Sequence, residues 1–329
     1  MPYKSEDQES SPDLKIIKLL ISNDEGILVA ESVSSRPTSS QTAFYVYRNE
    51  ERIFIQGYSI SQSIRFDTNG EPGIYRVLSF LRSSDGKIVS KYSGPIFLNP
   101  RSISLTHPPK LKPEDRALQF DVASWKFPAV YFAGKYSKLF VMTTAAVDRS
   151  KMTLPAFNRW TWAGAGKFPG HVLCVADPTL DLSEDMKLGW YLGTESHDAT
   201  DELCNLILQC ALALGIPNDQ IVFWGSSGGG FAALSLASRI EGATAVAINA
   251  QTDIFAYESK RVVEMVRKFC FSDHSVEDIK QRFSYRVDMS RAWKNNQSSK
   301  IIFIQNRLDT HHYNYPESVT TKSHPPVFY

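Results

Sequence analysis

The chain has 329 residues, of which 43% are hydrophobic and 22% charged, and its net charge is +1. This composition is typical of a soluble globular protein of one or two domains and gives no indication of a nucleic-acid partner. The four cysteines lack metal or redox spacing, the N-terminal residues show no signal-peptide core, and no segment is apolar enough to span a membrane. We therefore expect a cytoplasmic protein without a membrane span.

The first hundred residues alternate between apolar and polar positions, with turn signals between the alternating stretches. Residues 1–13 are polar and are expected to form a disordered tail. Residues 14–100 are predicted to form an all-β sandwich of the immunoglobulin or fibronectin type, because short strands recur at regular spacing. The predicted strands are 15–22, 43–47, 52–56, 61–66, 73–81, 87–92 and 95–98.

The periodicity changes after a proline-containing stretch, residues 101–125, which is predicted to be a linker. From residue 126 to residue 329, apolar strands alternate with helical patterns, which indicates a mostly parallel sheet covered by helices on both faces. The predicted strands are 139–142, 171–176, 221–224, 243–249 and 300–305, and the predicted helices are 198–214, 231–240, 258–270 and 275–283.

The pattern G-x-S-x-G occurs at Gly225, Ser227 and Gly229, between an apolar strand (220–224) and a small-residue helix (231–234). A nucleophile elbow needs this context, because a sharp strand-to-helix turn lifts the serine oxygen above the sheet. Glycines tolerate the crowded backbone of such a turn, and the helix N-terminus offers N–H groups to an oxyanion. The alternative is a chance pattern in an ordinary loop. The flanking strand and helix favour the elbow, with Ser227 as nucleophile.

An elbow of this kind requires an acid and then a histidine later in the chain. Asp309 follows the last predicted strand and is the candidate acid, although it could instead cap a turn; Asp253 is the competing acid. His324 is the candidate histidine, whereas His311 and His312 are so close to Asp309 that we expect them to line the pocket or bind substrate. The final stretch is short for this fold, so the alternative to His324 is that the sequence stops before the true histidine.

The oxyanion site needs two N–H donors. The first is expected from Gly228, which follows the nucleophile. The second is expected from the turn after strand 139–142, around residues 143–145, with Thr144 as the candidate. This assignment depends on topology alone, because no HGGG-type motif is present, and the alternative is that Thr143 and Thr144 simply end the strand.

Two aromatic segments, 157–162 and 189–193, precede the elbow. Trp160 and Trp190, with Arg159, are candidates for substrate binding, because flat aromatic faces suit sugar rings and an arginine suits an anionic group. The alternative is that these tryptophans belong to the core. The sequence implies neither a metal nor an organic cofactor.

From about residue 139 to residue 309 the sequence resembles the α/β-hydrolase superfamily. More narrowly, it is similar to bacterial hydrolase-fold proteins of surface polysaccharide and glycoprotein export, a group that includes the carbohydrate O-acetyltransferase of the accessory Sec system. The matching segments are ADPTL (176–180), LGWYLG (188–193), FWGSSGGGFAAL (223–234), INAQTDI (248–254) and IQNRLD (304–309). This resemblance implies an acyl-enzyme on Ser227, a carbohydrate substrate, and partners in polysaccharide or glycoprotein assembly. The stretch expected to end in the histidine is shortened or missing here.

The function expected from the sequence is that of a serine esterase or O-acetyltransferase, with Ser227, Asp309 and His324 acting through an acyl-enzyme. The sequence does not specify the final acceptor, water or a sugar hydroxyl. The rival hypothesis is a hydrolase-fold protein with an incomplete triad that serves as a carbohydrate-binding or assembly subunit.

Overall fold

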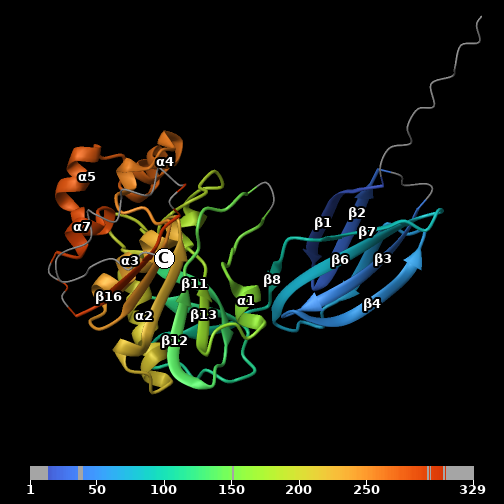
Figure 1. The fold of residues 1–329 in the computed structure, drawn as a ribbon, viewed down its shortest axis with the longest axis horizontal. Helices are drawn as coiled ribbons and strands as arrows, with labels where there is room; N and C mark the ends of the chain where they lie inside the picture. The colour runs from blue at the N-terminus through green and yellow to red at the C-terminus, as the bar shows by residue number, and fades with distance from the viewer. Residues whose placement is uncertain are drawn as a thin grey trace, which may run out of the picture. The chain divides into compact units, whose positions relative to one another are not determined.

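A computed structural model describes residues 14–35, 40–149, 152–294, 296, 298–306 and 308. Contacts between Cα atoms divide the chain into two units, with the boundary between Asn99 and Pro100 (Figure 1). We call them the N-terminal unit and the C-terminal unit, and each has its own hydrophobic core. The tail predicted over residues 1–13 lies outside the described residues.

The N-terminal unit consists of two antiparallel sheets that share one core. One sheet has the order β1-β2-β5, and the other has the order β4-β3-β6-β7 with β8 also paired to β6. Their core residues include Leu28 and Ile64 from the first sheet and Phe44 and Val77 from the second. The strands are β1 (Ile16–Asp24), β2 (Ile27–Ser34), β3 (Ser40–Arg48), β4 (Glu51–Ser59), β5 (Ser63–Asp67), β6 (Gly73–Ser83), β7 (Ile88–Tyr92) and β8 (Ile96–Leu98).

Strand β2 is the one strand of this unit that the sequence did not predict. Its inward positions are Leu28, Ala30, Ser32 and Ser34, so the buried row becomes small and polar along the strand. The hydrophobic alternation that identifies a strand is therefore weak, although the backbone pairs with both β1 and β5.

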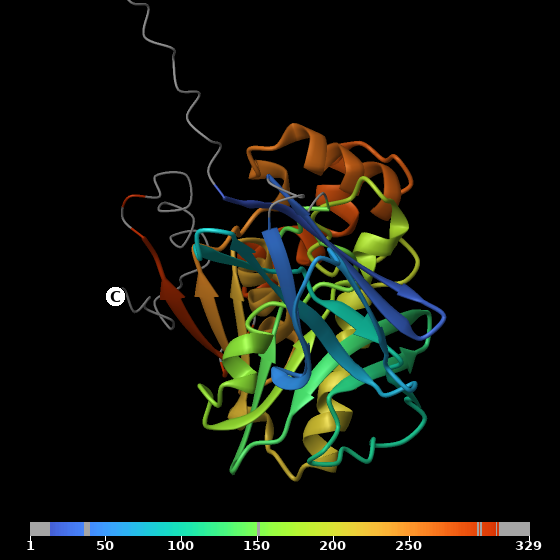
Figure 2. The same ribbon diagram turned by 90° about the vertical axis from the view of Figure 1, so that its right-hand side faces the viewer.

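The C-terminal unit is built around an eight-stranded sheet with the order β16-β15-β14-β12-β13-β11-β10-β9. Strand β11 runs antiparallel to both of its neighbours, and the other pairs are parallel. In Figure 2, β16 is the red strand at one edge of the sheet, beside β15. The strands are β9 (Arg101–Ser104), β10 (Ala117–Val122), β11 (Trp125–Phe132), β12 (Tyr136–Met142), β13 (Gly170–Val175), β14 (Ile221–Ser226), β15 (Thr244–Ile248) and β16 (Lys300–Ile304).

Helices α2 and α3 pack against each other and against the sheet, α2 on β10 and β11 and α3 on β14 and β15. Helices α4 to α7 lie together at one end of the unit (Figures 1 and 2). Within the described ranges no helix is both long and apolar enough to cross a membrane. The α-helices are α1 (Trp160–Gly164), α2 (Ala199–Ala213), α3 (Gly228–Arg239), α4 (Lys260–Cys270), α5 (Val276–Arg282), α6 (Ser284–Val287) and α7 (Met289–Ala292), and the 3-10 helices are η1 (Pro178–Leu182), η2 (Asn218–Gln220) and η3 (Ile254–Ala256).

Residues 101–125, predicted as a linker, instead contain β9, β10 and the first residue of β11. The prolines at 108, 109 and 113 lie in the connection between β9 and β10 and do not interrupt either strand. Leu118 and Phe120 of β10 are completely buried, so this stretch is part of the core. The proline cluster therefore marks a loop inside the C-terminal unit.

Candidate functional site

Ser227 lies at the junction between β14 and α3, where it is the N-cap residue of the helix. Its backbone has φ 53° and ψ −124°, a conformation that costs a non-glycine residue on the order of 1–3 kcal/mol and is concentrated at functional sites. The backbone N–H of Ser227 donates to the carbonyl oxygen of Ile248 at 2.9 Å, which anchors the turn to β15. The strained turn between a buried strand and a buried helix has the geometry of a nucleophile elbow.

The glycines around Ser227 are required by close backbone contacts. A Cβ atom on Gly225 would lie 2.0 Å from the carbonyl oxygen of Gly229, and one on Gly230 would lie 2.6 Å from the Cβ of Ala250. The hydroxyl of Thr143 donates to the Gly229 carbonyl at 2.6 Å, which fixes the first turn of α3 against the end of β12. The G-x-S-x-G pattern therefore permits the tight crossing of strand and helix.

The hydroxyl oxygen of Ser227 contacts an amide side chain. Gln251, three residues beyond β15, is completely buried, and its Nε2 donates to Ser227 Oγ at 3.1 Å. The Oε1 of Gln251 accepts a hydrogen bond from Nε1 of Trp190 at 3.0 Å, and Trp190 is also completely buried. The side chain of Ser227 is thus held by a chain of two buried groups.

Trp190 belongs to a loop that is fixed by buried polar contacts. Asp177, at the carboxyl end of β13, accepts hydrogen bonds from the backbone N–H groups of Thr179 at 2.9 Å and Tyr191 at 3.0 Å. Burial raises the pKa of Asp177 to about 6, and these hydrogen bonds only partly oppose that shift. Trp190 and Tyr191 both have positive φ, at 52° and 58°, so the loop is held in a conformation that it would not favour alone.

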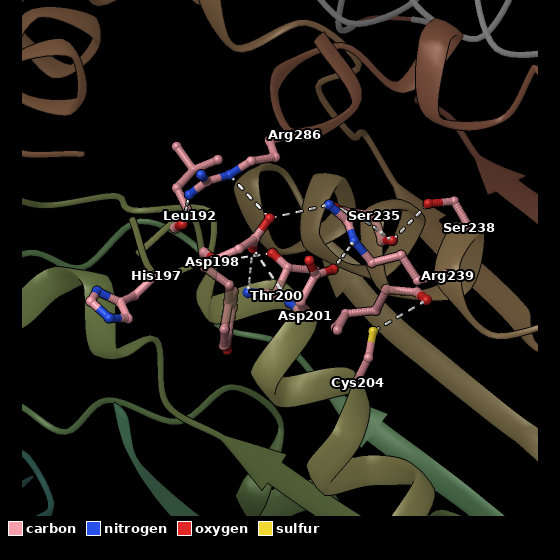
Figure 3. Close-up of polar contacts among 12 residues, drawn as sticks. Leu192, His197, Asp198, Thr200, Asp201, Cys204, Ser235, Ser238, Arg239 and Arg286 are labelled. Carbon is pink, nitrogen blue, oxygen red and sulfur yellow. Dashed lines mark hydrogen bonds and ion pairs between the residues drawn. The ribbon is translucent and has the colours of Figure 1, made fainter. Parts of the chain in front are cut away.

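A buried cluster of charges holds the far end of the same loop (Figure 3). Arg286, 2% exposed, donates to the carbonyl oxygens of Leu192 and Thr194, the second at 2.8 Å. Its Nε lies 3.1 Å from Asp198 Oδ2, and Arg239 of α3 lies 3.7 Å from the same oxygen. Asp198 is also the N-cap of α2. The cluster therefore joins α2, α6 and the elbow helix α3 to the loop that carries Trp190.

The two predicted oxyanion donors have different positions in the structure. Gly228 is the first residue of α3, where backbone N–H groups have no acceptor within the helix. The N–H of Thr144, by contrast, donates to the hydroxyl of Tyr191 at 2.8 Å, and that hydroxyl donates to the Val175 carbonyl. The prediction for Thr144 is therefore wrong, because its N–H is already committed inside the core.

The prediction that Trp160 and Trp190 bind substrate is also wrong, because both residues are buried, at 7% and 0% exposure. The exposed ring is Trp162, which is 47% exposed and has the Arg159 guanidinium 4.3 Å from its centroid. Trp162 lines a cavity of about 360 Å³ together with Lys167, Phe168 and Trp224. Trp160 and Trp162 lie on different sides of one short helix. Their spacing in the sequence does not show which of the two sides faces the core.

Asp309, His312 and His324 lie outside the described residues, and so does His311. The competing acid, Asp253, caps η3 through the N–H of Phe255 at 2.8 Å and forms an ion pair with Lys280. Each histidine of the described ranges contacts another side chain: His107 contacts Thr106, His171 contacts Tyr131, His197 contacts Ser196, and His274 contacts Glu195. Within those ranges no cluster of His, Cys, Asp and Glu could hold a metal ion.

Two residues of the site were missed by the sequence analysis. Gln251 was detectable, because it follows the strand adjacent to the elbow, and the carboxyl ends of parallel strands meet at one edge of the sheet. Arg286 gave no such signal, because it lies in the short helix α6, far from Ser227 in the sequence. It contacts the loop that carries Trp190 by donating to backbone carbonyl oxygens, which any loop offers.

The strand order of the sheet, its single antiparallel strand β11 near one side, and the elbow after β14 together define an α/β-hydrolase fold. This confirms the predicted α/β-hydrolase fold. No family model and no curated protein matches the chain.

Several solved structures are similar. The capsule O-acetyltransferase of Neisseria meningitidis serogroup A has 15% identity over 64% of this chain and 84% of that chain, with a TM-score of 0.48. The glycosylation-associated protein (Gap123) complex from Streptococcus agalactiae has 12% identity over 94% of this chain and 57% of that chain, with a TM-score of 0.48. Prolyl oligopeptidase B from Galerina marginata has 12% identity over 97% of this chain and 48% of that chain, with a TM-score of 0.47. At these identities and TM-scores, the fold assignment rests on the strand order and the elbow.

Proposed function

We propose that the protein is a serine-dependent carboxylic-ester hydrolase or O-acyltransferase. The observation that carries this proposal is the strained backbone of Ser227 at the strand-to-helix turn, with its hydroxyl oxygen held by Gln251. Ser227 is only partly buried, so part of this residue remains exposed to solvent. Strain of this kind is retained where a reactive group must be presented in one orientation.

In the proposed mechanism, His324 accepts the proton of the Ser227 hydroxyl and Asp309 orients the imidazole. The serine oxygen attacks the ester carbonyl carbon, the alcohol leaves with a proton, and an acyl group stays on Ser227. The N–H of Gly228, at the N-terminus of α3, stabilises the oxyanion. Water or a sugar hydroxyl then accepts the acyl group, which makes the protein a hydrolase or a transferase.

For the substrate, we propose an ester of a carbohydrate or glycoconjugate that carries a negative charge. The exposed ring of Trp162, the cavity that it forms with Phe168 and Trp224, and the cation of Lys167 support this class. Arg159 and Lys167 form no ion pair with any carboxylate in the described part of the chain, so both cations are available to an anionic ligand. Aromatic faces stack well on sugar rings.

A second candidate is a non-catalytic hydrolase-fold subunit that binds carbohydrate or serves in polysaccharide or glycoprotein assembly. The observation that favours it is that Ser227 Oγ accepts a hydrogen bond from the Gln251 amide, whereas a general base would be an imidazole. The same aromatic cavity would then be a binding site alone. In either case we propose partners among proteins of surface polysaccharide or glycoprotein assembly and a location in the cytoplasm.

For the fold, we further propose that helices cover both faces of the large sheet and that the N-terminal unit is an immunoglobulin-like sandwich. The shared core of its two antiparallel sheets supports the second point.

A fluorophosphonate probe separates the two candidate functions, because it phosphonylates an activated serine. Wild-type protein and Ser226→Ala should be labelled, whereas Ser227→Ala should not. Ser226 is the matched control, since it is the adjacent residue, the last of β14, and is also partly buried. Labelling that is absent from wild type, or that persists in Ser227→Ala, contradicts the enzyme proposal. Absent labelling together with binding of an acidic oligosaccharide would favour the second candidate.

A further inference from the structure

The sheet β4-β3-β6-β7 of the N-terminal unit carries arginines and tyrosines on the side opposite its hydrophobic core. Phe44 and Val46 of β3 belong to that core, so Tyr45 between them points to the opposite side of the sheet. Three tyrosine rings on this side each have a guanidinium group over them. We call these residues the arginine–tyrosine face: Tyr45, Tyr58, Tyr92, Arg52, Arg76 and Arg82.

The rings hold the arginines in place. The Cζ atoms of the three guanidinium groups lie 4.0 to 5.0 Å from the ring centroids, with Arg82 over Tyr58 at the shortest distance and Arg52 over Tyr45 at the longest. A guanidinium group that stacks on a ring still has its N–H donors along its own edge, where they can meet a planar anion. Because the side chain is already ordered, binding costs less conformational entropy.

The charges of this face are only partly balanced within the protein. Arg76 forms an ion pair with Glu50. In the part of the chain that the structure describes, neither Arg52 nor Arg82 forms an ion pair with a carboxylate, and Arg82 donates to the side-chain oxygen of Gln41 at 2.6 Å. Arg52 is exposed, and Arg82 is half-buried. The face therefore has two positive charges that an anionic ligand can neutralise.

These two arginines are far apart along the sheet. Arg82 is opposite Gln41 of β3, and Arg52 is opposite Tyr47 of the same strand. At the rise of a strand, these two levels of β3 are about 20 Å apart. A small anion can contact only one of the two arginines, whereas an extended polymer with repeated negative charges can contact both.

We propose that the arginine–tyrosine face binds an acidic polysaccharide through its carboxylate or phosphate groups. Both groups match the planar fork of a guanidinium group. A single-stranded nucleic acid would need open ring faces on which its bases could stack, whereas here the rings carry guanidinium groups. The choice of a polysaccharide over an acidic peptide rests on the proposed function, in which the substrate is an anionic carbohydrate. The inference adds to it a second carbohydrate site, in the N-terminal unit.

The test is a binding titration of the full-length chain. The carboxylate probe is an oligomer of galacturonic acid long enough to reach both arginines, and its methyl ester is the uncharged control with the same sugar rings. A polymer of glycerol phosphate is the phosphate probe. We expect saturable binding of at least one acidic probe that weakens as salt is added, and no binding of the methyl ester. Comparison of the two acidic probes shows whether the face prefers carboxylate or phosphate.

Variants locate the binding on this face. Arg52→Gln combined with Arg82→Gln should raise the dissociation constant about tenfold, because two exposed ion pairs with the ligand are lost. Lys18→Gln combined with Arg65→Gln removes the same charge from the other sheet of the unit and is the matched control, with binding close to wild type. Arg52→Lys combined with Arg82→Lys keeps the charge but not the stacked fork, so it should also weaken binding, although less.

Three results would overturn the inference: no binding of either acidic probe, equal weakening in the two glutamine variants, or wild-type affinity in the lysine variant. Tighter binding of oligothymidylate or polyglutamate than of either acidic probe would also overturn it, in favour of a nucleic-acid or acidic-peptide site. Fluorophosphonate labelling of the same proteins tests the proposed function separately. Labelling at Ser227 should be unchanged in the variants of Arg52 and Arg82, and its absence from wild type together with retained binding would overturn the proposed enzyme activity alone.

Discussion

At the scale of single residues, the site depends on a glycine at a position with no room for a side chain and on hydrogen bonds to a buried carboxyl group. Gly225 is necessary because the strand and the elbow helix are so close that a Cβ atom on this residue would overlap the carbonyl oxygen of Gly229. Asp177 is retained in the core because two backbone N–H groups of the surrounding loops donate to its carboxylate. Neither residue is expected to touch substrate, yet both position the groups that do.

The variant Gly225→Ala should be severely destabilised. Its Cβ would lie 2.0 Å from the Gly229 carbonyl oxygen and 2.3 Å from Thr143 Oγ1, so backbone must move to accommodate it. We expect the free energy of unfolding to fall by at least about 3 kcal/mol, the upper range for overpacked cores, in urea denaturation. Ser226→Ala, one residue further on, is the control and should remain close to wild type. A stable Gly225→Ala protein would contradict the close packing of the elbow.

Asp177 should make stability depend on pH. Burial raises its pKa from 3.8 to about 6, so between these values the folded protein retains a proton that the unfolded chain has released. Its contribution to stability is therefore greatest below pH 3.8 and is lost as the pH rises through 6, a change of up to about 3 kcal/mol. We expect Asp177→Asn to lack this component. Unfolding free energies of both proteins, measured from pH 4 to pH 7, should diverge with a steeper decline in wild type; parallel curves would refute the assignment.

At the scale of elements, helices α2, α3 and α6 are connected by the cluster of Asp198, Arg239 and Arg286 (Figure 3). Burial raises the pKa of Asp198, and the two guanidinium groups oppose that shift. The cluster fixes one end of the loop that carries Trp190. Trp190 in turn donates to Gln251, which donates to Ser227, so the cluster is connected to Ser227 through these hydrogen bonds.

Arg286→Met should destabilise the C-terminal unit by about 3–5 kcal/mol, because it removes one partner of a buried ion pair and the donor to loop carbonyl oxygens. Urea denaturation measures this loss, and the labelling rate at Ser227 should fall with it as the loop is released. The matched control is Arg261→Met, whose ion pair with Asp185 is 79% and 71% exposed and should contribute at most about 1 kcal/mol. Equal losses of unfolding free energy in the two variants would show that the buried cluster stabilises the protein no more than an exposed ion pair does.

Elements with a strong local signal could be predicted from the sequence, and those that depend on tertiary neighbours could not. The elbow was predictable because its glycines, strand and helix are contiguous. Strand β10 was not predicted because prolines lie close to it in the sequence. The burial of Trp160 and Trp190 was not predictable, because the sequence alone does not show whether an aromatic side chain faces the core or a substrate. Gln251 had a weaker signal, its place after a predicted strand, and its contact with Ser227 depends on the pairing of β15 with β14.

At the scale of the whole molecule, the two units have separate hydrophobic cores. The proposed chemistry belongs entirely to the C-terminal unit, since Ser227, Gln251 and the exposed Trp162 all lie beyond Pro100. The units should therefore respond independently to core substitutions.

Phe44→Ala tests this independence. Phe44 is completely buried in the core of the N-terminal unit, so its truncation should lower the stability of that unit by about 3–5 kcal/mol. Hydrogen exchange followed by mass spectrometry should show lost protection in peptides of β3 and β6 and unchanged protection in peptides of β14 and α3. Equal loss of protection in both units would mean that they unfold as one.

The acyl-enzyme is the most direct test of the central claim that Ser227 is a nucleophile. Protein mixed with p-nitrophenyl acetate and quenched rapidly in acid would be digested, and the acetylated peptide would be identified by mass spectrometry. If Ser227 is the nucleophile, we expect a burst of p-nitrophenol and an acetyl group on Ser227, both absent from folded Ser227→Ala and present in Ser226→Ala. No acetyl group on Ser227, or a burst that persists in Ser227→Ala, would contradict it.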